Sequence, residues 1–178
     1  MKSSFKLKFL MLLAIACLFS GIVMAQDTKK PLLSPRDSVS GTVAGANINI
    51  NYGSPSVRGR KIWGALEPYG AVWRAGANEA TRFTTDKDIM VDGKLLRAGT
   101  YGFFVIPNEG SWTVIFNSVP NQWGAFKYDN SKDVLRVSIK PTVVDLHERL
   151  VYTIDDKGFN LVWEKISVPV TITKTEIQ

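Results

Sequence analysis

The chain has 178 residues, one histidine, one cysteine and a formal net charge of +6. The charge falls to +3 without Lys2, Lys6 and Lys8, which belong to the signal peptide predicted below, and a charge of +3 is no argument for a nucleic-acid or acidic-membrane partner. Cys17 lies in the same segment, so the predicted mature chain excludes disulfides, a thiolate nucleophile and cysteine-ligated zinc.

Residues 1–25 have the pattern of a secretory signal peptide. Three lysines precede an apolar run over residues 9–23, and small residues stand at the −3 and −1 positions of a cleavage site after Ala25. The apolar run is shorter than the roughly 20 residues that span a membrane. An uncleaved anchor and a lipid on Cys17 are the alternatives. The pattern favours cleavage and predicts a periplasmic or secreted mature protein without a transmembrane segment.

Residues 26–35 are polar and are predicted to form a flexible N-terminal lead, followed by a single domain over residues 36–178. In this domain apolar and polar residues alternate with a period of two, which predicts strands with one buried and one exposed face. The clearest alternations are Ile48, Ile50 and Tyr52; Leu135, Val137 and Ile139, with Arg136, Ser138 and Lys140 facing out; and Val168, Val170 and Ile172. Pro169 predicts that the last strand lies at a sheet edge or beside a bulge.

Two central segments, residues 100–106 and 111–116, are apolar at nearly every position, which predicts strands covered on both faces. Asp92-Gly93 is a strong hairpin signal, and residues 108–110 and 156–158 predict further hairpin turns. About nine strands are expected, and no sustained helical period is present after residue 25. The sequence therefore predicts an all-β fold, an antiparallel β-sandwich.

Residues 53–80 interrupt this rhythm, and we call them the excursion. The segment contains seven glycines and prolines and no clear strand, although a helical turn fits residues 61–66. Long connections of this kind are usually functional or disordered, and the apolar content of this one predicts a structured segment. Together with Arg82 it carries five basic and two acidic residues, which equals the whole net charge of the predicted mature chain.

The excursion and its extension supply the candidate ligand-binding residues. Guanidinium, amide and carboxylate groups beside aromatic rings could hold a polar ligand. The candidates are Arg74, Asn78, Glu79 and Arg82, expected to converge in one network, with Trp63, Tyr69 and Trp73 against it. The alternative is a structural network in which Glu79 pairs with Arg74 or Arg82 and fixes the excursion to the sheet.

Other chemistries have weaker support in the sequence. His147 shares a strand face with Asp145, but two ligands do not make a metal site, so an exposed loop or edge histidine is expected and no metal or cofactor is predicted. Glycoside hydrolysis would pair Glu79 with another acid such as Asp129 or Glu109.

Three tryptophans within or beside predicted strands could in principle form a sugar platform. Their positions favour core packing instead. These residues are Trp112, Trp123 and Trp163.

Eight short motifs together resemble a known bacterial family. They are RGRKIWG (58–64), PYG (68–70), VWR (72–74), GANEAT (76–81), AGTY (98–101), WTVI (112–115), QWGAF (122–126) and DVLRV (133–137). The chain resembles the family called domain of unknown function 2911, common in secreted proteins of Bacteroidota, over about residues 34–172. The resemblance implies an exported bacterial domain and carries no established activity.

We interpret the sequence as an exported β-sandwich that binds a small polar or saccharide-like ligand, or an envelope partner, without catalysis. The second hypothesis is a hydrolase-like enzyme that uses Glu79 with Arg74 or Arg82. The third is a purely structural envelope protein.

Overall fold

The computed structural model describes residues 33–175, so the predicted signal peptide and residues 26–32 of the lead lie outside the described part of the chain. Within that part the chain forms ten strands and one short 3-10 turn, η1 (Asn130–Lys132). The strands are β1 (Arg36–Val43), β2 (Ala46–Gly53), β3 (Thr81–Thr85), β4 (Ile89–Val91), β5 (Lys94–Leu96), β6 (Gly99–Ile106), β7 (Trp112–Asn117), β8 (Asp133–Ile139), β9 (Thr142–Ile154) and β10 (Gly158–Lys174).

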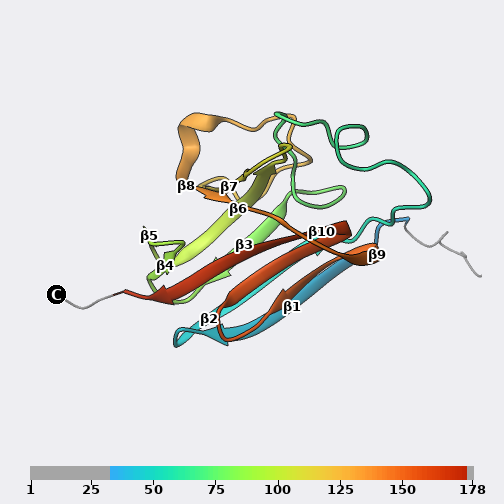
Figure 1. The fold of residues 1–178 in the computed structure, drawn as a ribbon. Coiled ribbons are helices and arrows are strands. Elements are labelled where there is room, and N and C mark those ends of the chain that lie inside the picture. The colour runs from blue at the N-terminus through green and yellow to red at the C-terminus, as the bar shows by residue number, and fades with distance from the viewer. Residues whose placement is uncertain (1–32, 176–178) are drawn as a thin grey trace, which may run out of the picture. The chain divides into compact units, whose positions relative to one another are not determined.

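The strands form two antiparallel sheets that pack face to face (Figure 1). The six-stranded sheet has the order β1-β2-β3-β6-β7-β8, and the four-stranded sheet has the order β5-β4-β10-β9. The predicted all-β antiparallel sandwich is confirmed, with one strand more than expected. The three predicted hairpin turns connect β4 to β5, β6 to β7 and β9 to β10.

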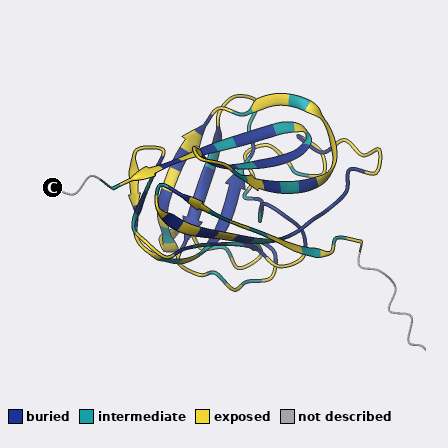
Figure 2. Cartoon of the chain, turned by 90° about the horizontal axis from the view of Figure 1, so that it is seen from below, coloured by how far each residue is buried: buried dark blue, intermediate teal, exposed yellow. Residues whose placement is uncertain are grey.

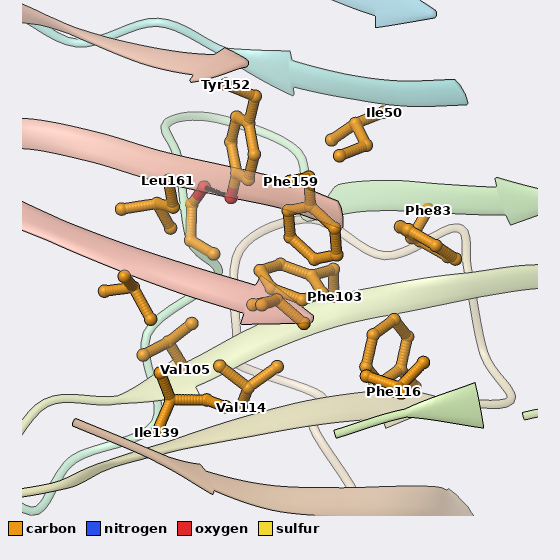
Figure 3. Close-up of a cluster of buried hydrophobic side chains, with 14 of the residues drawn as sticks. Ile50, Phe83, Phe103, Val105, Val114, Phe116, Ile139, Tyr152, Phe159 and Leu161 are labelled. Carbon is orange, nitrogen blue, oxygen red and sulfur yellow. Dashed lines mark hydrogen bonds between the residues drawn. The ribbon is translucent and has the colours of Figure 1, made fainter. Parts of the chain in front are cut away.

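The core lies between the two sheets, as the buried segments in Figure 2 show. Phe83 and Phe103 of the six-stranded sheet contact Phe159 of β10, with ring centroids 5.4 and 5.5 Å apart (Figure 3). The alternation predicted for β8 is confirmed, because Leu135, Val137 and Ile139 are buried and the residues between them are exposed. The alternations in β2 and at the end of β10 are confirmed in the same way.

Pro169 is predicted to lie at a sheet edge or beside a bulge. β10 is an inner strand in the order of its sheet, which excludes the edge, but its pairing with β9 is irregular between Val162 and Ile166, shortly before Pro169. β10 pairs with β9 as far as Ser167 and with β4 from Ile172 onward. Pro169 falls between these two paired stretches. Its missing N–H therefore breaks neither ladder, which explains why the strand tolerates it.

The outer face of the six-stranded sheet is divided into two halves. On β6 and β7, Phe104 and Ile115 are fully buried and pack with Ala80, and Val72 of the excursion and Ala125 of the loop after β7 lie against them. The prediction that these two strands are covered on both faces is confirmed. The half formed by β1 to β3 is uncovered and carries hydroxyl and amide side chains.

The excursion is structured, as expected, and is held by backbone hydrogen bonds. Trp73 and Val105 exchange two of them, at 2.8 and 2.9 Å. Residues 61–66 form consecutive turns rather than the expected helical turn, because Gly64 has a φ of +73° that a right-handed helix excludes. At Gly53 a Cβ atom would lie 2.1 Å from the carbonyl oxygen of Ala77, so only glycine permits this approach to β2.

Candidate functional site

Two pockets lie at the end of the excursion, and consecutive residues of the chain line different ones. The Trp123 pocket, about 370 Å³, is formed mainly by Arg36, Glu79, Arg82, Asn121, Gln122 and Trp123. The Glu67 pocket, about 430 Å³, is formed mainly by Ser34, Arg60, Glu67, Arg74, Asn78 and Trp163. Of the four polar residues expected in one network, Glu79 and Arg82 line the first pocket. Arg74 and Asn78 line the second.

The backbone at Asn78 explains this division. Asn78 has a φ of +64°, in the left-handed region that asparagine tolerates better than most residues. Its carbonyl oxygen accepts a hydrogen bond from the Gly124 N–H at 3.0 Å, and the next residue, Glu79, forms a β-bridge with Trp123. Residues 78 and 79 are thus fixed against the loop after β7, with their side chains in separate pockets.

In the Trp123 pocket the charged groups are connected through Asn51. Arg36 Nη1 lies 3.1 Å from Glu79 Oε2. Arg36 Nε and Arg82 Nη2 both donate to Asn51 Oδ1. Arg82 Nη1 also donates to Asn121 Oδ1 at 3.3 Å. Burial lowers the pKa of Arg36, an effect that the Glu79 carboxylate opposes and the Arg82 guanidinium reinforces. Asn51 therefore links the two arginines of this pocket, whereas the buried Oε1 of Gln122 has no hydrogen-bond partner within residues 33–175.

Trp123 gives this pocket an exposed aromatic surface. Its side chain is 63% exposed, whereas Trp112 and Trp163 are 2% and 1% exposed. The core positions predicted for Trp112 and Trp163 are confirmed, and the one predicted for Trp123 is wrong. Trp123 lies in the irregular loop between β7 and η1, where only its backbone is fixed by the bridge to Glu79.

The Glu67 pocket contains three charged side chains. Burial raises the pKa of Glu67 to about 7, although the positive charges of Arg74 and Arg60 act in the opposite direction. Arg60 is fixed by hydrogen bonds to the carbonyl oxygens of Ser56 and Val57. Arg74 differs, because its Nε is buried and has no hydrogen-bond partner within residues 33–175.

Two further residues complete the polar wall of the Glu67 pocket. Asn78 Nδ2 donates to the carbonyl oxygen of Ser34 at 3.1 Å, which ties the excursion to the segment before β1. Trp163 comes from β10, and its Nε1 is buried without a partner in the described part of the chain. Buried N–H groups normally have partners, so Trp163 and Arg74 both keep unused hydrogen-bonding capacity at this pocket.

The three aromatic candidates of the excursion line neither pocket. Trp63 and Trp73 are buried in a cluster of indole rings, with Trp63 4.6 Å from Trp112 and Trp73 stacked on Trp163 at 5.8 Å between ring centroids. Tyr69 is partly exposed and packs over Gly64. Trp63 and Trp73 therefore anchor the excursion in the core, and Tyr69 does not.

The carboxylates considered for glycoside hydrolysis do not come together. Of the described residues that line the Trp123 pocket, Glu79 is the only one with a carboxylate. Asp129 instead accepts a hydrogen bond from the Ser131 N–H and caps η1, and Glu109 lies in the β6–β7 turn. Glycosidases normally use a pair of carboxyl groups, so this pocket lacks that arrangement.

His147 lies on β9, the edge strand of the four-stranded sheet, opposite Glu164, and is exposed as expected. Across residues 33–175 no group of three or more His, Cys, Asp or Glu side chains could hold a metal ion. In the same residues no helix has the length and apolar character that crossing a membrane requires.

Several residues that line the two pockets were not among the ligand-binding candidates, Arg36, Arg60, Glu67 and Trp123 among them. Asn51, which links two of the arginines, was not a candidate either. Glu67 carried a signal, because it is the one acid besides Glu79 in the basic, aromatic part of the chain. Arg36 carried none, since its place beside Glu79 depends on the pairing of β1 with β2.

Comparison with known proteins identifies the family alone. No curated protein and no solved structure matches the chain. The profile of a family described as "Protein of unknown function (DUF2911)" matches residues 34–172, which include every described strand up to Ile172 and all but Leu33 of the residues that line the two pockets. The chain therefore belongs to the DUF2911 family.

Proposed function

We propose that the protein is exported and binds a saccharide-like ligand at the Trp123 pocket without changing it chemically. The observation that carries the proposal is an exposed Trp123 ring in one hollow with the Arg36, Glu79 and Arg82 side chains. An aromatic ring can cover the apolar face of a sugar, while charged and amide groups bond its hydroxyls. The signal peptide predicted over residues 1–25 supports export.

The uncovered half of the six-stranded sheet supports a ligand longer than one sugar unit. A second hollow shares Arg82 with the Trp123 pocket and is lined by Asn49, Thr84 and Thr100. A third hollow shares Asn49 and Thr84 with the second and continues toward Ser40. Amides and hydroxyls both donate and accept hydrogen bonds, as sugar hydroxyls do. The three hollows adjoin through these shared residues and form a track that ends at Trp123.

The test is a glycan array of neutral and acidic oligosaccharides, followed by calorimetric titration of each hit with the mature protein. We expect Trp123→Ala to weaken binding at least about tenfold, which corresponds to 1.4 kcal/mol of lost ring contact. Glu79→Gln should also weaken it, because a charged hydrogen-bond acceptor becomes a neutral one.

Phe126→Ala is the matched control, because Phe126 is 84% exposed in the same loop and does not line the Trp123 pocket. It should bind as the unmodified protein does. If no glycan binds, or if Trp123→Ala and Phe126→Ala behave alike, the pocket is not a saccharide site, and the Arg36–Glu79 pair is a structural contact.

A further inference from the structure

The Glu67 pocket is separate from the saccharide track and has a different chemistry. Among residues 33–175, the charged residues that line it are Arg60, Glu67 and Arg74, and the other residues that line it carry no charge. The pocket therefore contains two cations and one carboxyl group.

These charges face a common space without direct pairing. Among the described residues, neither arginine lies within 4.0 Å of a Glu67 oxygen, whereas three other ion pairs in the same residues reach 2.7 to 3.1 Å. Arg60 is fixed by two backbone carbonyl oxygens, so its position does not depend on Glu67. The charges of both guanidinium groups thus act on the Glu67 carboxyl group, but neither forms an ion pair with it, and space remains between the three groups.

The buried end of the pocket contains an excess of hydrogen-bond donors. Within residues 33–175 five buried side-chain atoms have no hydrogen-bond partner. Four of them are N–H groups, of Arg36, Trp63, Arg74 and Trp163, and only Arg36 among these lines the Trp123 pocket. The two indole rings lie 5.6 Å apart, and Arg74 and Trp163 both line the pocket. This cavity combines hydrogen-bond donors with positive charge. A complementary ligand accepts hydrogen bonds and carries negative charge.

We infer that the Glu67 pocket binds the carboxylate group of a small organic acid between Arg60 and Arg74, and that Glu67 competes with that carboxylate for the two arginines. Arginine forms bidentate hydrogen bonds with carboxylates, and Asn78 at the rim can hold a further polar group of the ligand. The Nε of Arg74 and the Nε1 of Trp163 are covered by protein atoms, so the ligand contacts the outer guanidinium nitrogens first and reaches the covered donors by side-chain adjustment.

Competition predicts a specific dependence on pH. The pKa of Glu67 is raised to about 7 by burial. Below that value Glu67 is neutral and leaves both arginines to the ligand. Above that pH, the negative charge of Glu67 offsets the positive charges of the two arginines and repels the carboxylate of a ligand. Simple organic acids remain ionised across this range, so the pH dependence belongs to the protein.

In the experiment the mature protein is titrated with three carboxylate probes: succinate, glucuronate and N-acetyl-alanyl-alanine. Glucose is the uncharged control for glucuronate, and the C-terminal amide is the uncharged control for the dipeptide. Each titration is run at pH 6 and pH 8, one unit on either side of the Glu67 pKa. The carboxylate probes that bind reveal whether the source is a free acid, an acidic sugar or a peptide terminus. Glucose and the amide should not bind this pocket.

We expect binding to be up to about tenfold weaker at pH 8 than at pH 6, which is the ratio of the neutral fractions of Glu67 at these two values. Glu67→Gln should bind as tightly at pH 8 as at pH 6, and more tightly than the unmodified protein at pH 8. Arg74→Gln should lose binding at both values. A gain of affinity in Glu67→Gln cannot come from misfolding, so this variant separates the proposal from a purely structural role.

The NMR signal of the Trp163 indole N–H gives a second readout, because it should shift as the carboxylate fills the pocket. Trp123→Ala is the matched control and should leave carboxylate binding unchanged, so that failure of this proposal and failure of the saccharide proposal are distinguishable. The proposal is overturned if no carboxylate probe binds at millimolar concentration at pH 6, or if Glu67→Gln keeps the pH dependence.

Discussion

Asn78 and Glu79 are neighbours in the chain, and the two pockets that they line differ in how their charged groups are paired. In the Trp123 pocket the arginines share Asn51, and Glu79 pairs with Arg36 near the surface. In the Glu67 pocket Glu67 is largely buried, and two buried donors have no partner among the described residues. The contacts of the Trp123 pocket should survive the replacement of one of its side chains. The groups of the Glu67 pocket are more deeply buried, so substitutions there should change the stability of the protein.

The largest expected difference comes from one substitution made in both pockets. Trp163 is 1% exposed, and replacing it with alanine should lower the free energy of unfolding by about 3–5 kcal/mol. Trp123 is 63% exposed, and the same change there should cost no more than about 0.5 kcal/mol. Urea denaturation of the two variants measures both values. Equal losses would mean that Trp123 supports the fold as well.

A smaller effect should appear as a function of pH. A carboxyl group whose pKa is raised in the folded state stabilises the fold most below its unfolded pKa, near 4.5, and this contribution is lost as the pH rises through about 7. Glutamine does not ionise, so Glu67→Gln removes this loss of stability with rising pH. Relative to the unmodified protein the variant should gain roughly 1–3 kcal/mol between pH 4.5 and pH 8, after allowance for solvent screening.

Stability measured by denaturation at a series of pH values in that window checks this expectation, because only the difference between the two proteins matters. Curves that remain parallel would show that Glu67 is as well solvated in the folded state as in the unfolded chain.

The smallest effect is expected at Glu79. The side chains of Arg36 and Glu79 are 29% and 57% exposed, and exposed ion pairs contribute only about 0–1 kcal/mol. Glu79→Gln should therefore shift the unfolding midpoint very little, since Asn51 still holds Arg36. Thermal unfolding monitored by circular dichroism is sufficient. A loss well above 1 kcal/mol would move Glu79 from the binding site to the structural framework.

Most of the sandwich could be predicted because its strands expose one face to water. Ile48 and Ile50 alternate with exposed asparagines, and Leu135 and Val137 alternate with exposed polar residues. β1 has no such clear pattern, because it is an edge strand and only one of its eight residues, Val43, is buried. Pro169 leaves an edge and a bulge open for a related reason, since a proline shows that a ladder is interrupted without showing where the strand lies.

The candidate site could be predicted only in part, because sequence proximity does not fix side-chain direction. Arg74 and Glu79 are close in the chain, but the left-handed backbone at Asn78 sends consecutive side chains to different pockets. Arg36 and Trp123 come from distant segments and reach Glu79 only through strand pairing and loop contacts. A tryptophan beside a strand also gives no indication of whether its ring turns inward or outward.

The order of the strands has a consequence for how the chain folds. β1 with β2, β6 with β7 and β7 with β8 pair between neighbours in the sequence, so most of the six-stranded sheet can assemble from local hairpins. In the four-stranded sheet β4 with β5 and β9 with β10 are also local hairpins, but β10, the last described strand, must still join β4 across a long stretch of chain. Contacts that close long loops form late. Until β10 arrives, the rings of Phe83 and Phe103 face water, and a chain that is still emerging would need protection from aggregation there.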